Sequence, residues 1–334
     1  MNEKNMTALV SCFSRSYHCR HNRFPVFKDD VAEKLLTQQE HDSIACNMSA
    51  GISFFNPDFK GTEDEALRWI VDNQLSPSVL ARSAFCEASL KTALLSGCRQ
   101  YIILASGYDT FAWRNAEGDI SVFELDRPEV IEDKKKRLEA AGLDPSKAEF
   151  IKCDFTDPGW SEALVSSSCD MSRLTFCSML GISYYLTKNE FCSMLGALST
   201  QLCDGSSLVF DYPAICGSKE TDINEQLAKG ADEEMKSKYS YDEIETALSA
   251  AGFLIYEHLD ASELTKNFFT SYNAVNPQHK LHVPEGVYEC QLESEPCARL
   301  ILSHLCSFES EPPKHRFLND PVCRSLHSYQ EYMI

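Results

Sequence analysis

Glycine and acidic residues follow three apolar stretches of the chain, in an order that could bind a nucleotide. Gly107 follows the run YIILAS, Glu124 closes the run ISVFE, and Asp154 with Phe155 closes IKCDF. Ligands of open parallel sheets lie beyond the carboxyl ends of the strands, where glycine lets the backbone approach and an acid binds ribose hydroxyls. These residues predict a turn beside the ligand, a ribose acceptor and an adenine contact.

The same stretch disfavours a dinucleotide. Such a site should show GxGxxG opening a helix to hold the pyrophosphate, whereas Gly107 is followed by YDTFAW with no further glycine. The order of glycine, acid and acid with aromatic fits S-adenosylmethionine better. Taken alone, Gly107 could be a simple turn, and Glu124 and Asp126 could be ordinary polar residues at a strand end.

The elements that must position these residues alternate between strand and helix patterns from residue 99 onward. The expected strands are 100–105, 119–124, 148–153, 173–178, 206–211, 253–259 and 286–292. The expected helices between them are 128–141, 160–165, 187–202, 220–236, 241–251 and 260–272. Alternation of this kind predicts a mostly parallel sheet with helices on both faces.

The N-terminal third reads as helical, apart from an irregular beginning. We expect a helix over 30–39, a second from the capping box of Thr62 and Glu65 to about residue 73, and a third from Ser76-Pro77 to Leu94. A second capping box, Thr187 with Glu190, is expected to start the helix 187–202.

Charge and composition restrict the partners. The 334 residues carry 31 basic and 50 acidic side chains, a net charge of −19, which argues against nucleic acid or an anionic membrane. No signal peptide and no apolar run of roughly 20 residues is present, so we expect a cytoplasmic protein, either a monomer or a homodimer.

The 15 cysteines are scattered through apolar runs and should be reduced. Cys12, His18, Cys19 and His21 lack zinc-site spacing, so no metal is expected.

Several motifs in sequence give a resemblance to a known family. The segments LARSAFCEASLKTALLSGCRQYIILASGYDTFAWR, FELDRPEVIEDKKKRL, FIKCDFTDPGWSEAL and GISYYLTKNEF resemble the leucine carboxyl methyltransferase family, in its bacterial branch of S-adenosylmethionine-dependent O-methyltransferases. The resemblance covers about residues 8–292. It implies a Rossmann-like class I α/β fold with a mostly parallel seven-stranded sheet, an N-terminal helical cap (1–98), a cofactor-binding core (99–292) and a C-terminal extension (293–334).

The resemblance also implies roles for particular residues. Arg82 would meet the methionine carboxylate, Gly107 would line the amino-acid end of the cofactor, Glu124 would bind the ribose, and Asp154 with Phe155 would hold the adenine. The further cofactor candidates beside these motifs are Ala105, Ser106, Asp109, Leu125, Ser178 and Met179. Asp211 and Tyr212, which end SSLVFDY, would face the acceptor and are catalytic candidates together with Arg15. Where the family usually has an acid, this chain has Leu180, so one contact to the amino group of the cofactor would be missing or supplied from elsewhere.

The identity of the acceptor decides whether a base is needed. A carboxylate with a pKa of about 4 is ionised at neutral pH, whereas an alcohol or phenol needs a nearby base. No histidine falls within the strand-end motifs, and His258 lies in a strand pattern that predicts a core position. We therefore expect a small carboxylic acid as acceptor, held by a cation such as Arg15 or Arg23. Methylation of a hydroxyl or phenol, an NAD(P) reductase, and a cofactor-binding protein without turnover remain alternatives.

Overall fold

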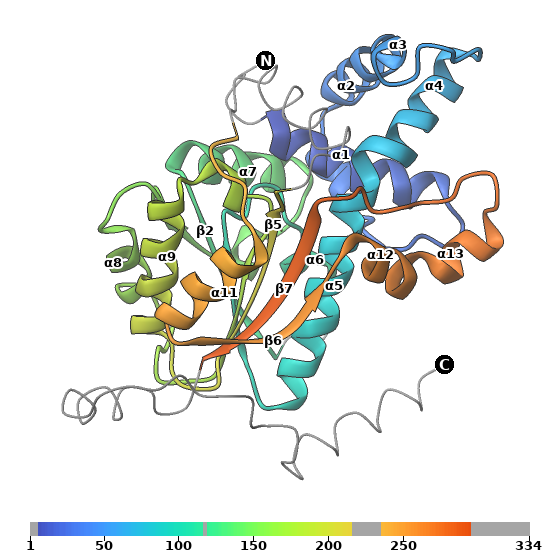
Figure 1. The fold of residues 1–334 in the computed structure, drawn as a ribbon. Coiled ribbons are helices and arrows are strands. Elements are labelled where there is room, and N and C mark those ends of the chain that lie inside the picture. The colour runs from blue at the N-terminus through green and yellow to red at the C-terminus, as the bar shows by residue number, and fades with distance from the viewer. Residues whose placement is uncertain (1–5, 116–118, 216–234, 295–334) are drawn as a thin grey trace. The chain divides into compact units, whose positions relative to one another are not determined.

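A seven-stranded sheet forms the centre of the computed structural model, which describes residues 6–115, 119–215 and 235–294 (Figure 1). The strand order is β3-β2-β1-β4-β5-β7-β6. The strands are β1 (Gln100–Leu104), β2 (Ser121–Asp126), β3 (Glu149–Lys152), β4 (Thr175–Met179), β5 (Ser207–Pro213), β6 (Phe253–Leu259) and β7 (Val287–Ser294). The first five run parallel, and β7 is antiparallel to both β5 and β6. The predicted α/β fold with a mostly parallel seven-stranded sheet is confirmed.

Alternate residues of β1 enter two different cores. Ile102 and Leu104 pack in one cluster, and Tyr101 and Ile103 pack in the other. Because successive side chains of a strand point to opposite faces, a strand between two helical layers must be apolar throughout. The continuous run YIIL therefore marks a strand that is covered on both sides.

Each core is closed by its own set of helices. The cluster around Ile102 includes residues of α8 (Trp160–Val165), α9 (Lys188–Gln201) and α11 (Tyr241–Ala250). The cluster around Tyr101 includes residues of α1 (Met6–His21), α5 (Ser76–Leu95), α6 (Phe111–Arg114) and α7 (Pro128–Ala140).

The capping boxes predicted for Thr62 with Glu65 and for Thr187 with Glu190 are both present. Short 3-10 turns lie at Pro145–Lys147 and Ser183–Tyr185.

The N-terminal segment differs from the sequence prediction in two places. The expected helix over 30–39 is wrong: a 3-10 turn spans Ala32–Leu35, and α2 (Gln38–Ala50) begins after Thr37, which forms a capping box with Glu40. The irregular beginning contains the helix α1, whose apolar spacing is weak. After α3 (Ile52–Phe55), the expected separate helices α4 (Glu63–Ile70) and α5 are joined by a π-helical turn over Val71–Leu75.

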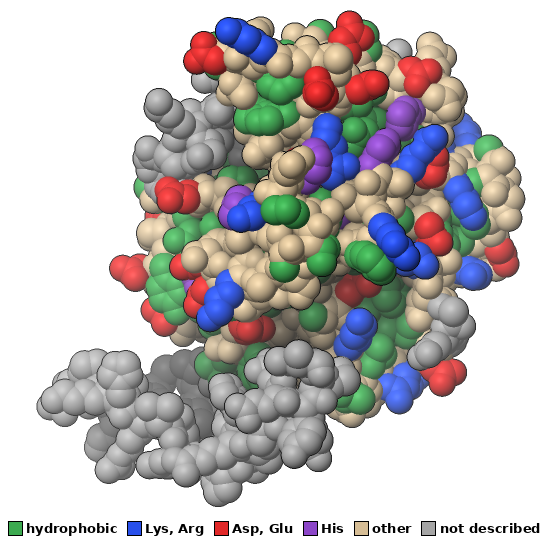
Figure 2. All heavy atoms as spheres, turned by 90° about the vertical axis from the view of Figure 1, so that its right-hand side faces the viewer, with side chains coloured by type: hydrophobic (Ala, Val, Ile, Leu, Met, Phe, Trp, Pro, Cys, Tyr) green, Lys and Arg blue, Asp and Glu red, His purple; other side chains and the backbone are tan. Residues whose placement is uncertain are grey.

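The expected helix over 260–272 forms in three pieces. They are α12 (Ala261–Leu264), a π-helical turn (Thr265–Phe269) and α13 (Thr270–Val275). The Tyr272 hydroxyl donates to the side-chain oxygen of Asn22 (2.8 Å), which ties α13 to the end of α1. Figure 2 shows the face of the molecule that carries α12 and α13, where acidic and basic side chains are interspersed. Most of the expected helix 220–236 and nearly all of 293–334 lie outside the described residues.

None of the helices in the described ranges has the length and apolar character needed to cross a membrane. In the same ranges, no group of three or more His, Cys, Asp or Glu side chains is arranged to hold a metal ion. Cys12 and His18 serve the fold instead, because the Cys12 thiol donates to the Ala32 carbonyl and His18 accepts from the Val26 amide.

Candidate functional site

A cavity of about 700 Å³ lies at the carboxyl ends of β1, β2 and β4, between these strand ends and the helices α1 and α5. Nine of the predicted site residues line it: Arg15, Arg82, Ala105, Ser106, Gly107, Asp109, Asp154, Phe155 and Ser178. Five do not: Glu124, Leu125, Met179, Asp211 and Tyr212. The position agrees with the rule that ligands of open α/β sheets bind beyond the carboxyl ends of the strands.

The turn after β1 is held in an uncommon backbone conformation. Ala105 has φ 54° and Gly107 has φ 49°, and Ala105 is the one non-glycine residue with positive φ in the described ranges. Such a conformation costs free energy for a residue with a Cβ, and it persists where the surroundings impose it. The Gly107 amide donates to the Asp126 carboxylate at 2.7 Å, and a Cβ on Gly107 would lie 3.4 Å from Ala8 of α1. The turn is thus fixed between β2 and α1.

Glu124, the predicted ribose acceptor, lies beneath the cavity. It is completely buried and forms an ion pair with Lys134 of α7, which is also completely buried. Burial, opposed by Lys134, raises the pKa of Glu124 to about 7. Oε2 of this carboxyl therefore already has a partner within the fold, whereas Oε1 has no hydrogen bond in the described residues.

Asp126, two residues beyond Glu124 in β2, lines the cavity. It ends β2 and accepts hydrogen bonds from the Gly107 and Arg127 amides, both at 2.7 Å. Burial raises its pKa, while the two amides lower it. Glu124 and Asp126 share one face of β2, since they are two residues apart. They differ in their position along the strand, because only Asp126 lies at its carboxyl end, at the edge of the sheet.

Asp154 and Phe155 follow β3 at one end of the cavity. The Thr156 amide and hydroxyl both bind the Asp154 carboxylate, at 2.9 and 2.7 Å, and they lower its pKa. The Phe155 ring packs edge-on against Trp160, with centroids 5.2 Å apart. The exposed Asp154 carboxylate can accept a hydrogen bond from an amino group, and the neighbouring Phe155 ring can pack against a planar base.

Arg82 reaches across the cavity from α5 to the end of β4. Its guanidinium has three polar neighbours, namely Tyr184, Asp211 and Ser11, and each is 3.4 Å away. Burial opposes its charge, but Tyr184 and Asp211 outweigh burial and raise the pKa of Arg82. Three long hydrogen bonds leave this cation able to exchange partners.

Gly181 makes room for the Arg82 guanidinium. It has φ +72°, and a Cβ there would lie 2.9 Å from Nη1 of Arg82. Its amide donates to the Asp211 carboxylate at 2.5 Å, so Asp211 lies just behind the cavity wall and contacts two residues of that wall. Leu180 itself lines the cavity as an apolar side chain.

Arg15 faces the cavity from α1 and is firmly held. Nε donates to the buried Asp29 carboxylate at 2.8 Å, and Nη2 donates to the Tyr108 carbonyl at 2.7 Å. Thr7, Ser11 and Arg15 are spaced four residues apart, so they form one polar stripe of α1 along the cavity. The alternative cation, Arg23, is exposed, lies over the Phe24 ring and does not line the cavity.

Tyr212 points away from the cavity into the opposite core. Its hydroxyl is 2.8 Å from Nε2 of His258, and its ring stacks on Tyr288. Tyr212 therefore does not line the cavity, because Tyr212 and Asp211 alternate across β5. Leu125 and Met179 are buried in the same core as Tyr212.

Residues missed by the sequence reasoning complete the lining. The main ones are Thr7, Ser11, Asp126, Arg127, Ile182 and Lys236. Tyr184 and Tyr185, expected to be packing or pocket wall, line the cavity with their rings 4.6 Å apart. Asp126 alone had a local signal, namely its place as the last residue of an apolar run.

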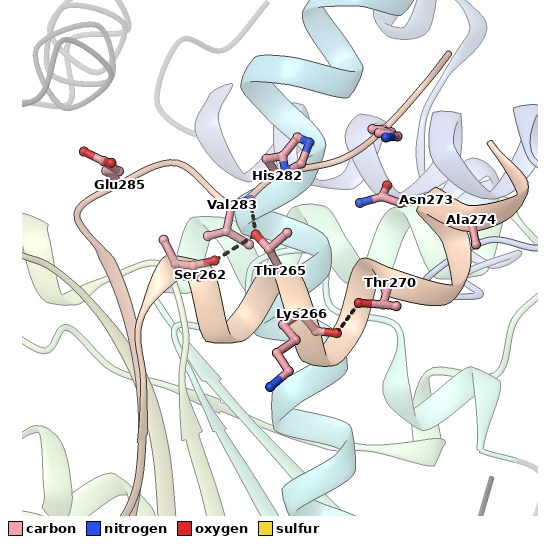
Figure 3. A pocket seen from close by; sticks show the side chains of 11 residues that line it. Ser262, Thr265, Lys266, Thr270, Asn273, Ala274, His282, Val283 and Glu285 are labelled. Carbon is pink, nitrogen blue, oxygen red and sulfur yellow. Dashed lines mark hydrogen bonds between the residues drawn. The ribbon is translucent and has the colours of Figure 1, made fainter. Parts of the chain in front are cut away.

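A second hollow, of about 610 Å³, lies on α12, α13 and the segment that follows them (Figure 3). Some of its polar side chains stabilise their own segment. Thr265 donates to the Ala261 carbonyl and accepts from the Val283 amide, and Asn273 bonds to both the amide and the carbonyl of Leu281. Thr265 and Asn273 are therefore already partnered within their own segment.

Comparison with known proteins decides the family. A family model described as leucine carboxyl methyltransferase matches residues 8–199, which is more than half of the 334-residue chain. The chain belongs to the leucine carboxyl methyltransferase family. YktD of Bacillus subtilis, provisionally named an S-adenosyl-L-methionine-dependent methyltransferase, is 36% identical over 283 residues, covering 81% of this chain and 93% of YktD. A similarly named protein of Mycolicibacterium paratuberculosis is 29% identical over 215 residues, covering 62% of this chain and 65% of that protein.

Solved structures share the fold of this family member. A protein of Streptomyces avermitilis aligns with TM-score 0.55 and 14% identity, covering 85% of this chain and 97% of that one. A protein of Thermobifida fusca, provisionally named a methyltransferase, aligns with TM-score 0.51 and 15% identity over 86% of this chain and 94% of that one. Together with the family match, the predicted family, fold and cofactor are confirmed, and the chain is an S-adenosylmethionine-dependent methyltransferase.

The cavity fits S-adenosylmethionine on its own chemistry. A volume of about 700 Å³ lies within the range of ligand sites, roughly 300–1,000 Å³. The buried Ser106 hydroxyl lines the cavity, and within the described residues its one polar interaction is with Glu124, whose pKa it lowers. Carboxylates at two strand ends and an arginine beyond a third provide acceptors for an adenosine and a cation for an amino acid.

Proposed function

We propose that this methyltransferase transfers the methyl group of S-adenosylmethionine to a carboxylate of a small-molecule acceptor. The observation that carries the proposal is the pair of arginines on one cavity. Arg82 and Arg15 both line it, and Ser11, which accepts from Arg82, lies one helical turn before Arg15 on α1. Two cations suit two carboxylates, one on the cofactor and one on the acceptor.

Individual residues can be assigned to the parts of the cofactor. Asp154 and Phe155 would hold the adenine, Asp126 would accept from the ribose hydroxyls, and Gly107 with Arg82 would hold the methionine end. Asp126 takes the role that the sequence suggested for Glu124, because it lines the cavity and Glu124 is paired with Lys134. Asp211, behind Gly181, would supply the negative charge that Leu180 lacks.

The chain itself mainly has to align the reactants and exclude water. The sulfonium supplies an activated methyl group, so an acceptor oxygen forms the new C–O bond as the C–S bond breaks, giving a methyl ester and S-adenosylhomocysteine. A carboxylate needs no proton removed. Within the described residues no histidine lines the cavity, which favours an acceptor of this kind. Arg15 would hold the acceptor, because Asp29 and Tyr108 already fix its orientation.

One feature favours a second candidate, methylation of a hydroxyl or phenol. Asp109 lines the cavity, and only its Oδ1 has an assigned role, as the acceptor for the Phe111 amide. The other oxygen could take the proton of a hydroxyl acceptor. In that case an ether would form in place of an ester.

Product chemistry tests the proposal and separates the two candidates. The purified protein is incubated with methyl-labelled S-adenosylmethionine and a panel of small carboxylic acids and phenols. We expect labelled product that releases labelled methanol in mild alkali, as a methyl ester does. A product stable to alkali would establish the ether. If the product is an ether, Asp109→Asn should abolish turnover. If the product is an ester, Asp109→Asn should leave turnover intact. Arg15→Gln should raise the KM for the acceptor. Arg23→Gln, which changes an exposed arginine outside the cavity, is the matched control.

A further inference from the structure

Glu289 is an unexplained buried acid next to the site. It lies in β7 directly opposite Asp211 of β5, and it is completely buried. Neither of its carboxyl oxygens has a hydrogen-bond partner within the described residues. A carboxyl group without partners in the interior is costly to ionise, so a neutral acid is the stable form.

One cation influences both carboxyl groups. Arg82 is 3.4 Å from the Asp211 carboxylate, and it acts electrostatically on Glu289, although no hydrogen bond joins it to Glu289 in the described residues. Burial raises the pKa of Glu289 well above its ordinary value, and the charge of Asp211 raises it further, while Arg82 opposes both. Two further titratable groups couple electrostatically to Glu289, the Cys86 thiol of α5 and the Cys290 thiol, which follows it in β7 and points to the other face of the sheet; burial raises the pKa of both thiols. No charged group of β6 acts on it, since Leu259 is its partner there.

We propose that Glu289 is a positioning residue whose bound proton keeps Arg82 available to the carboxylate of the ligand. With Glu289 neutral, Arg82 has one weak acidic neighbour and can turn its guanidinium into the cavity. With Glu289 ionised, a second buried negative charge attracts the same guanidinium toward the sheet. The inference rests on the proposed role of Arg82 in binding the amino-acid end of the cofactor.

The sign of the pH dependence follows from this arrangement. Raising the pH removes the proton from Glu289, so binding of a ligand with a carboxylate should weaken as the pH rises. A ligand without a carboxylate does not use Arg82 and should show no such loss. The protonated acid is mimicked by glutamine, which has the same shape and cannot ionise.

The test is the dissociation constant of S-adenosylhomocysteine measured by calorimetry from about pH 6.5 to about pH 9.5, a range in which the ligand amino group also titrates. We expect wild-type and Glu289→Gln affinities to be equal while Glu289 keeps its proton, and wild-type affinity to be about tenfold lower once the infrared band of the Glu289 carboxyl shows that the proton is lost, as expected for one charge-assisted hydrogen bond. The titration of the ligand is common to both proteins and cancels in their ratio. 5′-Methylthioadenosine, which shares the adenosine but has no amino-acid end, should give parallel profiles for the two proteins.

Each other outcome has a defined meaning. Equal affinities of wild type and Glu289→Gln for S-adenosylhomocysteine above the pH at which the Glu289 carboxyl loses its proton, or a Glu289 that is already ionised at about pH 6.5, would overturn the role of Glu289. If Arg82→Gln binds S-adenosylhomocysteine as tightly as wild type at neutral pH, the assignment of Arg82 itself fails. If Glu289→Gln does not fold, Glu289→Met provides a neutral side chain of similar length, and the same flat profile is expected of it.

Discussion

The cavity at the strand ends and the hollow on α12 and α13 have similar volumes, about 700 and 610 Å³, but their polar groups are used differently. In the cavity the polar interaction of the Ser106 hydroxyl within the described part of the chain is with Glu124 alone, and all three bonds of the Arg82 guanidinium are 3.4 Å long. In the hollow, Thr265 and Asn273 bond to main-chain groups of their own segment at 2.8–2.9 Å. Volume does not identify a site, whereas polar groups that can change partners do.

The origin of the difference is topological. Parallel strands end at one edge of the sheet, where each leaves its last residue and the following turn without a neighbouring strand. The polar groups of that edge, such as Asp126 and Ser106, face a space that the sheet cannot fill. A helical excursion such as α12 and α13 must instead satisfy its own backbone, and Thr265 and Asn273 do so.

The largest effect is expected below the cavity, at the buried ion pair. Glu124→Gln should lower the free energy of unfolding by about 3–5 kcal/mol at pH 8, because it leaves the Lys134 ammonium buried without a counter-ion. Urea denaturation measures the loss. Glu132→Gln removes the exposed partner of Lys152 and serves as the control, with a change below about 1 kcal/mol. The opposite result would be a loss of stability in Glu124→Gln no larger than in the control, together with weaker cofactor binding. That result would identify Glu124 as a ribose ligand.

A smaller effect, on binding, is expected at the edge of the sheet. Asp126→Asn should weaken S-adenosylhomocysteine binding by about 10–100-fold, the equivalent of roughly 1.5–3 kcal/mol for hydrogen bonds to a charged acceptor. Isothermal titration calorimetry gives the dissociation constant. Asp157→Asn changes an exposed loop carboxylate that binds only the Gly159 amide and does not line the cavity, and it should bind like wild type. Equal affinities of the two variants would show that the ribose lies elsewhere.

The smallest effect is expected at the hollow. Thr265→Val removes the donor to the Ala261 carbonyl and the acceptor of the Val283 amide, so the free energy of unfolding should fall by about 1–2 kcal/mol. The affinity for S-adenosylhomocysteine should stay within about twofold of wild type, because the hollow and the cavity share no residue. A tenfold loss of affinity without a change in Tm would mean that the hollow takes part in binding.

The sequence by itself determined the sheet and its helices. The run YIIL predicted a strand covered on both sides, and the capping boxes at Thr62 and Thr187 predicted where two helices begin. These signals are local, because strand burial and helix capping depend on residues within a few positions of each other. They also located most of the cavity, since the carboxyl end of a parallel strand can be recognised from the strand itself.

Only the tertiary structure decided which polar residue faces the cavity. Glu124 and Asp126 are equivalent by type and by face, but Lys134, ten residues away in α7, neutralises the first and leaves the second at the edge. Tyr212 is placed away from the cavity by the alternation of β5, and Glu289 reaches Asp211 only because β7 inserts between β5 and β6. The state of a charged side chain depends on what is packed around it, and those neighbours are brought together by the fold from distant parts of the chain.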